Sequence, residues 1–105
     1  MTDETTPETA DTVTLIAYLE ARPGAEPALI AAITAILPAV LAEDGCLDYR
    51  AHLLAQASGT VVMYERWRDQ QAFEAHAAGP AFTGLAARFD DLLGAPLRLE
   101  FLDPL

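Results

Sequence analysis

The sequence is poor in residue types on which several classes of protein depend. It has one cysteine, Cys46, and therefore can form neither an internal disulfide nor a structural zinc site made of cysteines. Lysine is absent, and six arginines stand against sixteen acidic residues, giving a net charge of −10 and a pI near 4.3. A phosphate backbone or an anionic membrane surface would repel this chain, so we expect neither nucleic acid nor a membrane as a partner.

Signals for targeting and for common cofactors are missing as well. The N-terminus is acidic and lacks the basic and apolar regions of a secretory signal, which makes a cytoplasmic location the expectation. The most apolar stretch, 28–42, is too short to span a bilayer. No glycine-rich turn matches a dinucleotide or P-loop fingerprint, so we expect no nucleotide cofactor. His52 and His76 lack the spacing of a helical metal pair, and we expect no metal.

What the chain does contain is apolar surface. Of its 105 residues, 52% are hydrophobic. This is enough for the core of one domain, and it is more than a small monomer can easily bury. Residues 1–11 are mostly Thr, Glu, Asp and Pro, and we expect an acidic tail without fixed structure there. The sequence therefore predicts a single domain over 12–105 that associates with a second copy of itself.

Alternating apolar and polar residues predict four strands, at 12–20, 46–54, 60–67 and 96–102. The strongest signal is the third, TVVMYERW, where Glu65 shares a face with Met63 and Trp67. Gly45, at the turn before the second strand, is expected in the left-handed conformation.

In the two remaining stretches, apolar residues recur at the spacing of a helix. Pro27 suits the first turn of a helix that carries an apolar stripe, and Pro38 should kink or break this helix near its end. Asp69 is expected to cap a short helix containing His76, and Gly79-Pro80 to separate it from a helix over 82–93. The order β-α-β-β-α-β predicts a ferredoxin-like α+β fold, a four-stranded antiparallel sheet with helices on one face. A second subunit would cover the other face if that face is apolar.

The stretch 43–85 contains three groups of residues that form a recognisable pattern. The first is an acid-x-Gly-Cys-x-x-Tyr motif, made of Glu43, Gly45, Cys46 and Tyr49. The second is the strand end Tyr64, Glu65, Arg66 and Trp67, and the third, behind it, is Asp69, Phe73, His76 and Phe82. With this pattern the sequence resembles the antibiotic biosynthesis monooxygenase family, including its quinol monooxygenase branch, and the likeness extends over about 12–103. The resemblance implies a homodimer in which two sheets form a dimeric α+β barrel. It also implies a small pocket between sheet and helices, with no prosthetic group or metal.

The reaction implied by the resemblance is oxidation of an electron-rich phenol, hydroquinone or anthrone by dioxygen. A base deprotonates the substrate, whose anion then reduces dioxygen. We expect His76 to be this base, with Glu65 as its neighbour, because histidine ordinarily titrates near pH 6.5. Haem-degrading and some anthrone-oxidising branches use an asparagine near the active centre, and this chain has none. The quinol-type reaction is therefore favoured.

The predicted pocket walls are aromatic: Trp67, Tyr49, Tyr64, Phe73, Phe82 and Phe89. Simpler structural roles stand beside these functional ones. His76 fits a core histidine bonded to a strand carboxylate, Trp67 fits plain core, and one of the two tyrosines fits a subunit interface.

Other polar residues are expected to have structural roles. Arg66 is expected in an inter-subunit salt bridge, His52 beside Asp48 and Arg50 on a solvated or interface face, and Cys46 as a small buried hydrophobe.

Two other functions remain open from the sequence. The same fold can serve as a non-enzymatic dimeric module that binds an aromatic metabolite, and a cavity filled by Trp67 and Phe89 would favour that function. An isomerase acting on a small hydroxyketone would instead need several polar groups converging in the cavity.

Overall fold

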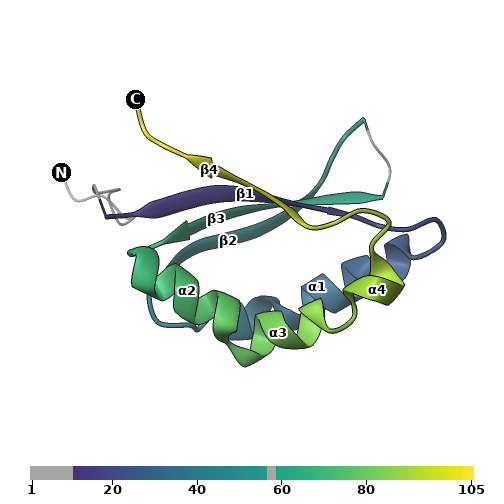
Figure 1. The fold of residues 1–105 in the computed structure, drawn as a ribbon, viewed down its shortest axis with the longest axis horizontal. Coiled ribbons are helices and arrows are strands. Elements are labelled where there is room, and N and C mark those ends of the chain that lie inside the picture. The colour runs from purple at the N-terminus through teal and green to yellow at the C-terminus, as the bar shows by residue number, and fades with distance from the viewer. Residues whose placement is uncertain (1–10, 57–58) are drawn as a thin grey trace.

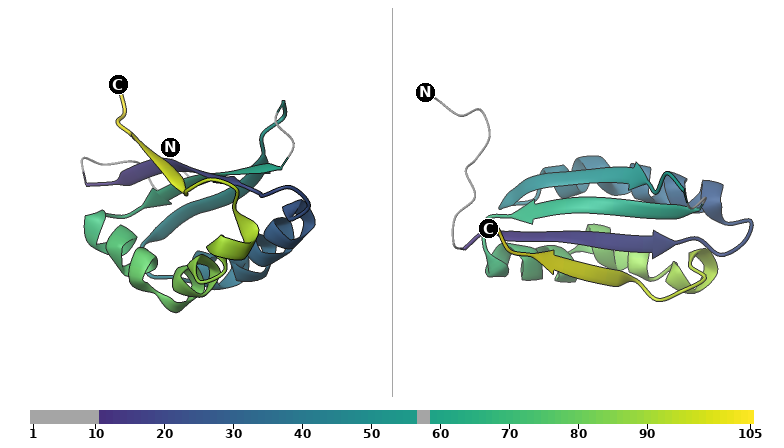
Figure 2. Two further views of the ribbon diagram at one scale, coloured as in Figure 1. Left: turned by 45° about the vertical axis from the view of Figure 1, so that its right-hand side comes forward. Right: turned by 90° about the horizontal axis from the view of Figure 1, so that it is seen from above.

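The computed structural model describes residues 11–56 and 59–105, so nearly all of the predicted tail lies outside the described residues. Four strands form one antiparallel sheet in the order β2-β3-β1-β4, with bounds as follows: β1 (Val13–Glu20), β2 (Cys46–Leu53), β3 (Thr60–Trp67) and β4 (Arg98–Leu102). All helices lie on one side of this sheet (Figure 1), and the view from above shows the other side uncovered by helices (Figure 2). The predicted α+β, ferredoxin-like arrangement is confirmed.

The longest helix, α1 (Glu26–Leu41), packs beneath β2. It starts with Pro27 in its first turn, as predicted, and buries Leu29 and Val40. Pro38 does not break the helix, which continues to Leu41: Val40 is completely buried in the last turn, and the Pro38 carbonyl accepts a hydrogen bond from the Ala42 N–H at 3.2 Å. No helix in the described part of the chain is long and apolar enough to cross a membrane.

Three short helices follow β3: α2 (Gln70–Ala78), α3 (Pro80–Ala86) and α4 (Phe89–Leu92). The Asp69 carboxylate caps α2 as predicted, accepting a hydrogen bond from the Ala72 N–H at 2.8 Å. The single helix predicted over 82–93 is wrong, since the backbone leaves helical geometry at Arg88. This break lets the Leu92 carbonyl accept a hydrogen bond from Arg22 N–H at 2.9 Å, which ties α4 to the end of β1.

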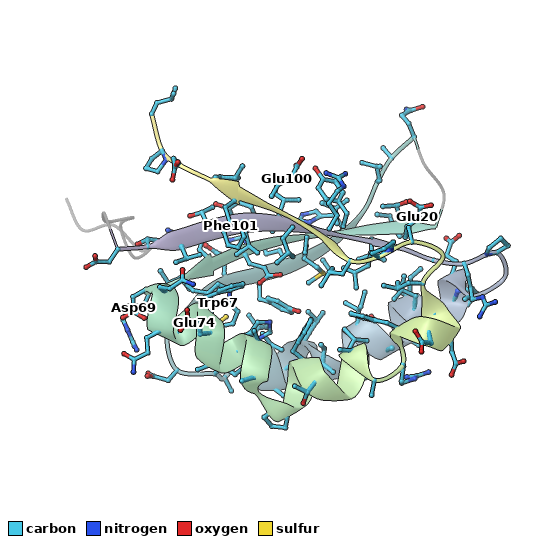
Figure 3. The ribbon with its side chains drawn as sticks, viewed as in Figure 1. Glu20, Trp67, Asp69, Glu74, Glu100 and Phe101 are labelled. Atoms are coloured by element: carbon cyan, nitrogen blue, oxygen red, sulfur yellow. The ribbon has the colours of Figure 1, made fainter. Side chains whose placement is uncertain are left out.

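The strand register sorts side chains onto two faces. Leu15 pairs with Glu65, which pairs with Tyr49, and all three point toward the helices. Figure 3 shows Trp67 between sheet and helices and Glu100 on the opposite face. That open face also carries Arg66, whose Nε lies 2.6 Å from Oδ2 of Asp48 in the same chain; its predicted inter-subunit salt bridge stays a prediction.

Gly45 forms the turn between α1 and β2 and adopts φ +82°, as predicted. A Cβ at this position would lie 2.5 Å from the Cβ of Ala72 on α2, whereas at Gly24, with φ +86°, a Cβ would meet no atom within 4 Å. We expect Gly45→Ala to lower the free energy of unfolding by about 2–4 kcal/mol and Gly24→Ala by about 1 kcal/mol, because only the first adds a clash to the backbone strain. Urea unfolding followed by circular dichroism measures both; equal losses would contradict the clash.

Candidate active site

A cavity of about 230 Å³ lies between the sheet and helices α2 and α3. Its wall is almost entirely apolar, and its polar side chains are Tyr49, Glu65 and His76. The remaining lining residues are Leu15, Ala17, Leu19, Ile33, Met63, Phe73, Ala77, Phe82, Leu85, Leu97 and Leu99. The cavity thus extends to the β4 edge of the sheet, where Leu99 is partly exposed.

His76 is held rigidly at this cavity by three aromatic rings and one carboxylate. Its Nδ1 lies 2.8 Å from Oε1 of Glu43, and the residue is only 5% exposed. The imidazole stacks on the Trp67 indole at 4.5 Å between centroids, with Tyr49 at 5.4 Å and Phe82 at 5.6 Å. The hydrogen-bond partner of His76 is therefore Glu43, while Glu65, predicted as its neighbour, lines the same cavity without bonding to the imidazole.

Glu65 is a buried carboxyl group, 5% exposed, that also lines the cavity. Its Oε1 accepts a hydrogen bond from Nε1 of Trp67 at 3.0 Å. Burial raises the pKa of Glu65 from 4.5 to about 7, the charge of Glu43 adds to the rise, and the Trp67 bond opposes it. Near neutral pH this group therefore exists in both protonation states, as a proton donor or acceptor in an active site must.

Tyr49 supplies the third polar group of the wall. Burial raises the pKa of its hydroxyl, and the nearby charges of Glu65 and Glu43 raise it further. The phenol therefore stays protonated and acts as a hydrogen-bond donor, not as a base. Cys46, at the start of β2, is half-buried, and burial raises the pKa of its thiol to about 11.

Three of the predicted pocket residues lie elsewhere. Tyr64 is on the opposite face of the sheet, because neighbouring residues on a strand point to opposite sides and Glu65 faces the cavity. Trp67 is completely buried behind the wall, where it supports Glu65 and His76. Phe89 packs against Phe82, with ring centroids 6.0 Å apart, and does not line the cavity. Tyr49, Phe73 and Phe82 do line it.

The structure places the two histidines apart. His52 lies on the open face of the sheet with its Nδ1 3.3 Å from the Val62 carbonyl, whereas His76 lies on the helix side. Within residues 11–56 and 59–105, no group of three or more His, Cys, Asp and Glu side chains could hold a metal ion.

Glu43 is the site residue that sequence reasoning did not identify. It lies in the turn after α1, 33 residues from His76, and no local pattern links the two. The available signal was its place as the acid of the acid-x-Gly-Cys-x-x-Tyr motif.

Comparison with known proteins gives a consistent result. Residues 12–88 match the family model described as "Antibiotic biosynthesis monooxygenase". "Putative monooxygenase Rv0793" from Mycobacterium tuberculosis is 34% identical over 93 residues, 89% of this chain and 91% of that protein. Its solved structure has a TM-score of 0.83 over 90% of this chain and 95% of that one.

Two further relatives agree. The structure of PA3566 from Pseudomonas aeruginosa is 31% identical, with a TM-score of 0.85 over 94% of this chain and 99% of that one. "Putative monooxygenase YcnE" from Bacillus subtilis is 28% identical over 81% of this chain and 90% of that protein. With its family model matched over most of its length, the chain belongs to the antibiotic biosynthesis monooxygenase family.

Proposed function

We propose that this protein is a cofactor-independent monooxygenase that oxidises a small, uncharged, electron-rich aromatic alcohol with dioxygen. The observation that carries the proposal is the apolar cavity at which His76 and Glu65 meet. The apolar wall offers water few hydrogen-bond partners, which limits its competition for the proton and protects radical intermediates from side reactions. His76 is the base, Tyr49 donates a hydrogen bond to the developing oxyanion, and Phe73 and Phe82 shape the walls.

The substrate itself supplies the electrons. His76 takes the hydroxyl proton, and the phenolate passes one electron to dioxygen, which gives a phenoxyl radical and superoxide. The two radicals combine to form a carbon–oxygen bond at a ring carbon that carries hydrogen. The resulting peroxide loses that hydrogen as a proton while its O–O bond breaks, so that water leaves and a quinone remains. One hydroxyarene and one dioxygen thus yield one quinone and one water, and the proton on His76 is returned in forming the water.

Charge and size narrow the substrate class. The cavity wall contains a carboxyl group and no arginine, and the Glu43 carboxylate lies directly behind His76, so a carboxylated substrate would be repelled. A cavity of about 150 Å³ holds one benzene ring in a well-studied protein. The volume of about 230 Å³ therefore favours one or two fused rings over the three of an anthrone.

We also propose that the working unit is a homodimer formed through the open face of the sheet. Ile16, Val62 and Tyr64 on this face are only partly exposed by the single chain and have no helix above them. On the same face Arg50 and Arg66 share Asp48, and Arg98 pairs with Glu100, so these three cations and two carboxylates carry a net charge of only +1 before a partner arrives. Such a face suits a second copy better than water.

The test is oxygen consumption by the metal-free protein with three matched compounds: 1-naphthol, 1-hydroxy-2-naphthoate and anthrone. We expect consumption above the autoxidation background with 1-naphthol, matched by formation of the quinone. Carboxylated naphthol is expected to be inactive, and anthrone slower. Binding of 1-naphthol without consumption would favour the non-enzymatic binding module, and an isomerase would consume no oxygen at all. If none of the three compounds binds or reacts, the proposal fails.

A further inference from the structure

A second hollow lies on the outer surface, on the other side of His76 from the cavity. Glu43, Arg68, Ala75 and Gly79 contribute to its wall. His76 borders both spaces, and Glu43 borders only the outer one. The Glu43 side chain is 22% exposed, so the Glu43–His76 pair lies between the cavity and the outer hollow.

Glu43 itself is held in a fixed place. Its N–H donates to the Val40 carbonyl at 2.9 Å, and its carbonyl accepts from the Cys46 N–H at 3.1 Å. Arg68, which shares the outer hollow, pairs with Asp44 and Asp69 and not with Glu43. The carboxylate is therefore left to the imidazole of His76.

The two nitrogens of His76 have different surroundings. Nδ1 bonds to Glu43, and an ionised carboxylate can only accept, so the proton of a neutral imidazole lies on Nδ1. Nε2 has no hydrogen-bond partner among the described residues. In the same residues, every side-chain nitrogen or oxygen that is shielded from solvent does have a partner. Nε2 therefore reaches open space, with its lone pair free.

We propose that Glu43 is a positioning residue that holds His76 in the Nδ1–H tautomer and so presents the Nε2 lone pair to the substrate in the cavity. The inference deepens the proposed function, since a base must present an unprotonated nitrogen to the hydroxyl it deprotonates. The charged or titratable groups facing His76 are Glu43 from the turn after α1, Tyr49 from β2 and Glu65 from β3. Of these, only Glu43 bonds to the ring.

The test reads the tautomer directly. The 15N shifts of the imidazole are recorded in the full-length protein at a pH above which its spectrum no longer changes, because protonated and bare ring nitrogens differ widely. We expect a protonated Nδ1 and a bare Nε2 in the wild type and in Glu43→Gln, whose side-chain carbonyl still accepts. Glu43→Ala should shift the ring toward a mixture of tautomers, while Asp44→Ala, which removes the neighbouring carboxylate, should not. An unchanged ring in Glu43→Ala, or an Nε2–H wild type, would overturn the inference.

Turnover gives a second reading that separates the two proposals. With 1-naphthol, Glu43→Ala should lower kcat by about 10–100-fold while KM changes little, and Glu43→Gln should restore part of the loss. If the tautomer behaves as expected but the wild type consumes no oxygen, the positioning role stands and the monooxygenase proposal falls. If kcat in Glu43→Ala equals that of the wild type, Glu43 does not position the base.

Discussion

Replacing His76 with alanine is expected to lower kcat for oxygen consumption with 1-naphthol by about 100-fold or more, because a positioned general base contributes roughly that factor. His52→Ala is the matched control, since it removes the only other histidine from the opposite face of the sheet, away from the cavity, and light scattering checks that this variant keeps the dimer. The measurement is the initial rate of oxygen uptake under substrate saturation, with autoxidation subtracted.

A structural role for His76 also predicts loss of activity, so the experiment needs variants that separate the two roles. His76→Phe keeps a flat ring against Trp67 but has no nitrogen, and it should be folded and inactive. In His76→Ala the vacated space should admit free imidazole, which restores part of the rate only if a base is what was lost. Light scattering should give about twice the 11.3 kDa chain mass for every variant. Unfolding of both variants, with no rescue, would support the purely structural role.

The second large effect concerns the pH dependence of stability and its origin in Glu65. The pKa of this group is raised from 4.5 to about 7 in the folded protein, so between these values the native state binds more protons than the unfolded chain. The free energy of unfolding must then fall as the pH rises through this window, by about 3 kcal/mol from this group alone. Its contribution is fully present below pH 4.5 and is lost above pH 7.

Glu65→Gln should remove this slope. The amide oxygen still accepts the hydrogen bond from Trp67 and carries no charge to desolvate, so at pH 8 the variant should be more stable than the wild type. Urea unfolding at pH 5, 6, 7 and 8 measures the difference, which should grow with pH. Glu74→Gln, which removes an exposed carboxylate on α2, controls for the change in net charge. If plots of the free energy of unfolding against pH run parallel for Glu65→Gln and the wild type, burial does not shift the titration of Glu65.

Much of the fold could be predicted because strand alternation and turn residues act locally. The four strands, Asp69 as a cap and Gly45 as a left-handed turn residue all depend on near neighbours in sequence. The break at Arg88 could not be seen in the helical spacing, because it accompanies a hydrogen bond between the Arg22 N–H and the Leu92 carbonyl, two residues far apart in the chain.

The candidate site was predictable only in part, for a similar reason. Periodicity assigns residues to the two faces of a strand. It placed Glu65 on the correct face, and the same alternation places Tyr64 on the opposite face, away from the cavity. Which carboxylate His76 would meet depends on how the turn after α1 meets α2, and this is tertiary geometry. The motif that begins with the acid Glu43 pointed to the correct turn, but it did not indicate that Glu43 would bond to His76.

Trp67 gives the protein a property that is separate from catalysis. It is the only tryptophan in the chain, its indole N–H bonds to Glu65, and its ring stacks on His76. All ultraviolet emission from indole thus originates one side chain away from the cavity. The emission of this single fluorophore therefore reports on the surroundings of Glu65 and His76 together. The molecule therefore carries an optical probe of its own site, which needs no label and no substrate.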